Sequence, residues 1–181
     1  MMNQKKNVAG PLPVQGVRDP FATILEHITG RTSSLAKGTG LTEAALLEAV
    51  SEAVGSAVGE AVATGTDLVP ATKAIVVGVL RGTEAKDEAA LMILSTTART
   101  VVHHTADRGG NLAAASKGLV LGAIASAKAI GVDVAKAAST AAQGAYEGAV
   151  SAGPVTVERV VGALKESIGG IRVVLPAPQP T

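Results

Sequence analysis

The sequence predicts an all-α protein, a compact array of about six to seven helices rich in alanine and glycine, followed by a short extended C-terminal segment. Apolar residues recur at the spacing of an amphipathic helix along most of the chain. Asp or Asn repeatedly stands directly before such a run, as a helix N-cap does. The hydrophobic fraction is 47%, but with one Phe, one Tyr and no Trp the core must come from small side chains. Such side chains fill space only where backbones approach closely, so we expect tight helix contacts.

Composition narrows the functional classes. The formal net charge is +1, from 16 basic and 15 acidic residues, so there is no electrostatic case for a nucleic-acid partner. The absence of cysteine excludes disulfides and thiolate metal sites and suits a cytoplasmic location. The first residues lack the apolar run of a secretory signal, and no stretch reaches the ~18 apolar residues of a spanning helix.

One helical domain with a tail at each end is the expected organisation. Residues 1–18 mix proline, glycine and polar residues without periodicity, which predicts a flexible arm. The helical domain is expected over 19–170. Residues 171–181 are expected to be extended, with 171–175 forming a short strand or a packing segment before a proline-rich tail.

Cap and breaker residues set the ends of the first two helices. Asp19 and Pro20 predict a helix start, and Gly30 is expected to end that helix before a polar loop over 31–40. A second helix is expected over 42–63. It is amphipathic, with an apolar stripe on one side and a polar stripe opposite, formed by Glu48, Glu52, Ser56 and Glu60.

Five further helices complete the expected array. The third and fifth are apolar nearly all round, which favours central positions covered by the other helices. Their expected ranges, in chain order, are about 66–81, 84–106, 111–130, 133–151 and 156–168.

The stretch 111–152 is expected to be central, as a hairpin of two closely packed helices. A related pattern of an Asp or Asn cap, Ala four residues later and Gly eleven residues later occurs in the third, fifth and sixth helices. The caps Asp67, Asn111 and Asp133 are separated by 44 and 22 residues, which predicts an internal repeat of about 22 residues.

Four glycine pairs at i and i+4 lie inside the expected helices. Glycine in a helix interior costs ~1 kcal/mol relative to alanine, so each pair needs a structural reason. We favour close helix crossing within one domain over association in a membrane or an oligomer. The pairs are Gly55/Gly59, Gly78/Gly82, Gly118/Gly122 and Gly144/Gly148.

His103, His104 and Asp107 form the most suggestive cluster of chemical groups. On a helix, either histidine reaches the face of Asp107, and such a pair can supply two ligands of a metal site. No third or fourth ligand is evident, and the remaining histidine, His27, stands on another helix. The simpler interpretation is that histidines near a helix C-terminus complement its dipole.

Other patterns have simpler explanations. Ser34 and Lys37 match the S-x-x-K spacing of some acyl-transfer enzymes, but the companion motifs are missing. The glycines around Lys37 lack the order and the preceding strand of a phosphate-binding loop. Tyr146 is expected to be a packing anchor. We therefore assign no catalytic residue and expect no cofactor.

Three functions remain open. The first is a non-enzymatic helical structural or protein-interaction protein that self-associates through small-residue helix packing, with a homo-oligomer or another protein as its partner. The second is a membrane- or lipid-surface-associated protein, which the regular lysines and the amphipathic neighbouring helices disfavour. The third is a small metal-binding protein or enzyme centred on His103, His104 and Asp107.

Overall fold

The computed structural model describes residues 19–38 and 40–177, and within these ranges it contains seven helices and no strand. The all-α class is therefore confirmed. The predicted arm over 1–18 lies outside the described residues, as does the end of the predicted tail. The helices are α1 (Pro20–Ala36), α2 (Glu43–Ala63), α3 (Leu68–Thr83), α4 (Asp87–Asp107), α5 (Leu112–Ile130), α6 (Val134–Ala152) and α7 (Pro154–Leu164).

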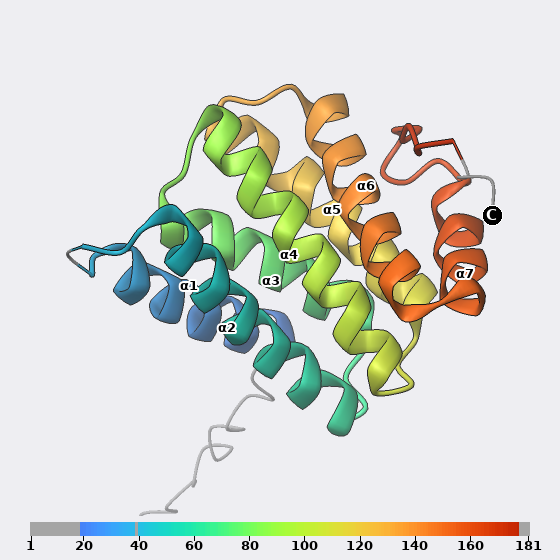
Figure 1. Ribbon diagram of the computed structural model, residues 1–181, viewed down its shortest axis with the longest axis horizontal. Helices are drawn as coiled ribbons and strands as arrows, with labels where there is room; N and C mark the ends of the chain where they lie inside the picture. The colour runs from blue at the N-terminus through green and yellow to red at the C-terminus, as the bar shows by residue number, and fades with distance from the viewer. Residues whose placement is uncertain (1–18, 39, 178–181) are drawn as a thin grey trace, which may run out of the picture.

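The helices form two layers connected in a zigzag (Figure 1). In one layer α1, α3, α5 and α7 lie side by side, and in the other α2, α4 and α6 do so. Consecutive helices contact each other across the layers. The hairpin predicted over 111–152 is present as α5 and α6, but its glycines face α3 and α4 rather than each other. Close packing is therefore within a layer, between helices that are not consecutive.

The contact between α1 and α3 depends on the glycines of α3. A Cβ built at Gly78 would lie 3.0 Å from Cγ2 of Ile28, and one at Gly82 would lie 2.7 Å from the carbonyl oxygen of Thr29. Thr32 lies over Gly82 and donates a hydrogen bond of 3.3 Å to the carbonyl of Gly78. Because any side chain at these glycines would collide with α1, they allow the two backbones to meet.

The contact between α3 and α5 has the same form. Here Thr72 and Val76 of α3 lie on Gly118 and Gly122 of α5, and a Cβ at Gly122 would lie 2.7 Å from Cβ of Val76. The Thr72 hydroxyl donates a hydrogen bond of 3.0 Å to the Ala115 carbonyl. Helix α3 is therefore held from both sides, and every residue from Ala74 to Leu80 is buried, as expected for a central helix.

In the second layer, α6 packs its glycines on the backbone of α4. A Cβ at Gly144 would lie 3.0 Å from Cβ of Ala98, and one at Gly148 would lie 3.1 Å from Cα of Arg99. Alanines fill most of the remaining buried face of α6. The space left for side chains between α4 and α6 is correspondingly thin, which explains why small residues dominate there.

Helix α1 does not end at Gly30, and the loop predicted to begin at Arg31 is helical as far as Ala36. Thr32 explains the difference. It is fully buried against α3, and its hydroxyl donates a hydrogen bond of 2.8 Å to the Ile28 carbonyl. Packing on α3 outweighs the ~1 kcal/mol that glycine costs inside a helix.

Three further predicted helix ends, in α4 and α7, differ from the structure. Helix α4 begins at Asp87 rather than at residue 84, because Glu84 adopts a left-handed conformation with φ of 53° that terminates α3. Helix α7 begins at Pro154, where a proline fits the first helical turn, and it ends at Leu164 rather than at residue 168.

The C-terminal segment packs on the core and forms no regular strand within the described residues. Ile168 and Ile171 form a single antiparallel bridge, with N···O distances of 2.9 and 3.0 Å. Ile168 and Val173 are buried in the core. The Val174 amide donates a hydrogen bond of 3.2 Å to the hydroxyl of Ser139 on α6. Of the two predicted alternatives for 171–175, the packing segment is therefore confirmed.

Helix α5 is the one described helix that is long and apolar enough to cross a membrane by length and composition. Half of its apolar window is buried inside the protein, by its neighbours in the two layers. A core helix of this kind meets the same criteria as a spanning helix.

Candidate functional site

A groove of about 330 Å³ lies between α1 and α2, which are the first helices of the two layers. Apolar side chains form part of its lining, with Ile24 and Ile28 from α1 and Ala57 and Ala61 from α2. Ile28 is fully buried because it also packs on α3. The packing of α1 on α3 therefore fixes one wall of the groove.

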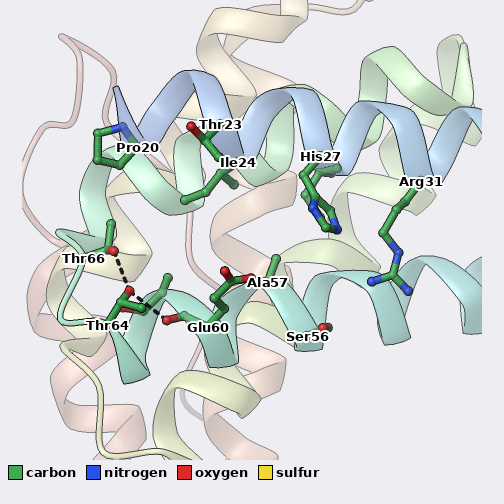
Figure 2. Close-up of a pocket in the computed structure, with 12 residues that line it drawn as sticks. Pro20, Thr23, Ile24, His27, Arg31, Ser56, Ala57, Glu60, Thr64 and Thr66 are labelled. Atoms are coloured by element: carbon green, nitrogen blue, oxygen red, sulfur yellow. Dashed lines mark hydrogen bonds between the residues drawn. The ribbon is translucent and has the colours of Figure 1, made fainter. Parts of the chain in front are cut away.

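Charged and hydroxyl side chains line the rest of the groove (Figure 2). His27 and Arg31 extend from α1 toward α2, and Glu60 extends from α2. The hydroxyl oxygens of Thr64 and Thr66 are 2.8 Å apart and close one end. In the part of the chain that the structure describes, the ion pairs involve none of the three charged or titratable groups. The groove is therefore bordered by charged or titratable groups that have no ion-pair partner among the described residues.

The outward side of α1 continues this surface. Thr23, Glu26, His27, Gly30 and Arg31 are all exposed. A Cβ built at Gly30 would meet no atom within 4 Å, in contrast to the glycines of α3 and α5. We call these five residues the α1 edge. It is the end of the α1–α3–α5–α7 layer, and no described residue covers its glycine.

The structure brings His103 and Asp107 of the predicted cluster together. Nε2 of His103 lies 3.4 Å from Oδ2 of Asp107, and both side chains are about half exposed, at 45% and 54%. This pair follows from their i, i+4 spacing on α4. It is a surface contact at the C-terminal end of the helix, where a positive imidazolium would also complement the helix dipole.

His104 points elsewhere, against α2. A Cβ built at Gly55 would lie 2.6 Å from Nε2 of His104, so the ring occupies the space that a side chain at Gly55 would fill. Arg108 covers Gly59 in the same way. Burial lowers the pKa of His104, and the nearby His103 and Arg108 lower it further, while Asp107 opposes them. All four predicted glycine pairs are therefore used for helix contacts within the chain.

The predicted metal site has no complete ligand set in the described ranges. They contain no group of three or more His, Cys, Asp or Glu side chains placed to hold a metal ion. His103 and Asp107 supply two adjacent groups, whereas the ring of His104 packs on Gly55. Metal binding by His103, His104 and Asp107 stays a prediction.

The remaining sequence patterns serve structural roles where the structure describes them. Ser34 lies on α1, and its hydroxyl donates a hydrogen bond of 3.0 Å to the Gly30 carbonyl, so it lies in a helix and not in the expected loop. Lys37 is the C-cap of the same helix. Tyr146 is buried on α6, which confirms the expected packing position.

Sequence reasoning missed the groove and the α1 edge. Gly30 was the available signal, because it stands eleven residues after its cap Asp19, as Gly78 does after Asp67. The sequence pattern led instead to a helix end at Gly30. In the structure α1 continues past Gly30 and exposes this glycine to solvent, so Gly30 lies inside a helix rather than at its end.

Comparison of the chain with protein-family models, with curated proteins and with solved structures gives no match.

Proposed function

We propose that this protein is a non-enzymatic helical scaffold that self-associates by packing a second copy of the chain against the α1 edge. The observation that carries this proposal is the uncovered Gly30. Gly78 of α3 is covered by α1, and Gly122 of α5 is covered by α3, but no described helix lies on Gly30. A helix from a second copy would continue the same layer.

The groove beside the α1 edge supports the same proposal. A helix lying on Gly30 would pass beside His27 and Arg31, which line the groove. Its apolar side chains would be buried against Ile24 and Ala57, and polar groups at its borders would meet charges that have no ion-pair partner among the described residues. An apolar centre with a polar border is the usual anatomy of a protein interface.

The internal glycine pairs limit how the protein can self-associate. Three of the four pairs lie against backbone or Cβ atoms of neighbouring helices, and the side chains of His104 and Arg108 cover the fourth, so a second copy would have to displace these contacts to use them. Close small-residue packing between copies must therefore use glycines that remain open, such as Gly30. The predicted sequence unit of cap, Ala and Gly is consistent with stacking of this kind.

Sedimentation of the full chain tests the proposal. We expect the protein to form a dimer or a larger assembly between about 1 and 100 µM, the range in which interfaces of moderate size associate. A charged side chain at Gly30 would prevent close approach of a second helix. Because Gly30 is exposed with open space around it, Gly30→Glu should fold and should sediment as a monomer.

Met92→Glu is the matched control. Met92 is an exposed residue inside α4, a helix of the other layer, and it does not line the groove beside the α1 edge. This variant should assemble like the unmodified chain. A monomer at every concentration for the unmodified chain would overturn the proposal, and so would an equal loss of assembly in the two variants.

A further inference from the structure

A second cavity, of about 350 Å³, lies between the C-terminal parts of α3 and α5, and the loop from α3 to α4 forms one side of it. Val77 and Leu80 line it from α3, and Ile130 lines it from α5. The volume falls within the range of small-molecule sites, roughly 300–1,000 Å³. None of its lining residues belongs to the α1 edge or to the groove beside it.

Ser126 carries an unpartnered hydroxyl at this cavity. It continues the stripe of Gly118 and Gly122 on the side of α5 that faces α3, at the same four-residue spacing. Thr72 and Val76 cover the two glycines, but the cavity begins at Ser126. The residue is 6% exposed, and its Oγ is buried without a hydrogen-bond partner among the described residues. A buried hydroxyl without a partner is costly, so rotation of the Ser126 side chain toward a ligand oxygen in the cavity would be favourable.

Two positive charges and one negative charge line the same cavity. Arg81 at the end of α3 and Lys86 in the following loop are both exposed, and Glu84 stands between them in the sequence. None of the three takes part in the ion pairs of the described ranges. The side chains leave one net positive charge, which favours a ligand with a single negative charge over a phosphate or a dicarboxylate. The C-terminal ends of α3 and α5 add partial negative charge and weaken this attraction.

We propose that this cavity binds a small amphipathic carboxylic acid. Its carboxylate lies between Arg81 and Lys86 and accepts a hydrogen bond from Ser126 once this side chain has rotated toward the cavity, and its hydrocarbon part lies against Val77 and Ile130. The guanidinium of Arg81 can donate two parallel hydrogen bonds to a carboxylate. The apolar wall then selects acids with a hydrocarbon chain over acetate or inorganic anions.

Titration of the full-length protein with octanoate, followed by amide chemical shifts, tests this proposal. We expect saturable shifts at residues 77–86 and 125–130. 1-Octanol has the same chain length without a carboxylate, and it should bind more weakly. Arg81→Gln should weaken octanoate binding about tenfold, since it removes a charge-assisted bidentate contact. Ser126→Ala should also weaken it, while the helical circular dichroism of both variants stays unchanged.

Lys128→Gln provides the matched control, because Lys128 is an exposed lysine on α5 that does not line the cavity. This variant should bind octanoate as the unmodified chain does. The proposal is overturned if octanoate produces no saturable shifts, or if the shifts map to the groove between α1 and α2. Equal affinity for octanoate and 1-octanol, with no effect of Arg81→Gln, would also overturn it, since carboxylate recognition would then be absent.

Discussion

Thr72 of α3 rests directly on Gly118 of α5, and its hydroxyl donates a hydrogen bond of 3.0 Å to the Ala115 carbonyl one turn before that glycine. The same hydroxyl lies 2.7 Å from the Leu68 carbonyl oxygen of its own helix, so its single hydrogen is shared between the two acceptors. One buried polar group therefore joins two helix backbones at a point where no side chain separates them. The contact depends on the absence of a Cβ at Gly118.

Gly118→Ala should destabilise the protein. The added methyl group would collide with Thr72 Oγ1 and with carbonyl oxygens of α3, and backbone atoms cannot move aside as a flexible side chain can. We expect a loss of roughly 1–3 kcal/mol in the free energy of unfolding, as for other overpacked cores. Chemical denaturation followed by circular dichroism measures it.

Gly162→Ala should change the free energy of unfolding in the opposite direction, and it serves as the control. This glycine is exposed on α7 with open space around its Cα. The substitution should stabilise the protein by up to about 1 kcal/mol, the difference in helix propensity. If both alanine variants were stabilising, the close contact at Gly118 would be refuted.

The stability of the protein should fall as the pH is lowered below about 6.5, the ordinary pKa of histidine. Burial against α2, together with His103 and Arg108, holds the pKa of His104 below that value in the folded protein. The unfolded chain therefore binds a proton first as the pH falls, and folding loses free energy until the folded-state pKa is reached. Above about pH 6.5 this contribution is constant, because His104 is neutral in both states.

Denaturation curves between about pH 5 and pH 8, the range in which histidine titrates, measure this effect. His104→Gln removes the titrating group and should flatten the curve of stability against pH. A stability that rises on acidification, or a slope that is the same in His104→Gln, would contradict the prediction.

Glu84→Gly should stabilise the protein by roughly 1 kcal/mol, because Glu84 holds a left-handed conformation with φ of 53° that glycine adopts without a steric penalty. Thermal unfolding measures the change. Lys86→Gly is a suitable control in the same loop, since Lys86 has an ordinary extended conformation with φ of −129° and should lose stability. Equal losses in the two variants would show that the conformation of Glu84 carries no strain.

Local sequence signals predict most of the helices correctly. Asp133 was expected to cap the sixth helix, and its carboxylate accepts a hydrogen bond of 2.8 Å from the Lys136 amide. Asn111 caps α5 in the same way, through the Ala114 amide at 3.0 Å. Such caps depend on residues within one turn, so they can be recognised from the sequence without knowledge of the fold. Gly30 was misjudged because the continuation of α1 depends on α3, which is distant in the sequence.

The choice of neighbours could not be predicted from the sequence. A glycine pair indicates that some helix approaches closely, but Gly118 and Gly122 do not specify α3 rather than α6. The predicted histidine cluster shows the same limitation. The spacing of the histidine cluster places His104 within reach of Asp107. In the structure, however, the His104 ring fills the space above Gly55 of α2. The groove between α1 and α2 likewise arises from the layer arrangement, which no local pattern encodes.

The contacts on glycine also restrict how the array can deform. If α3 slid along α5 by less than one turn, Thr72 and Val76 would leave the spaces over Gly118 and Gly122 and meet the side chains that border them. The next pair with the original spacing begins at Gly122 itself, four residues or about 6 Å along the axis. Gliding in small steps is therefore blocked, while tilting about the points of contact is not. Any motion that a bound partner imposes on this protein should change the angles between helices and leave their axial alignment intact.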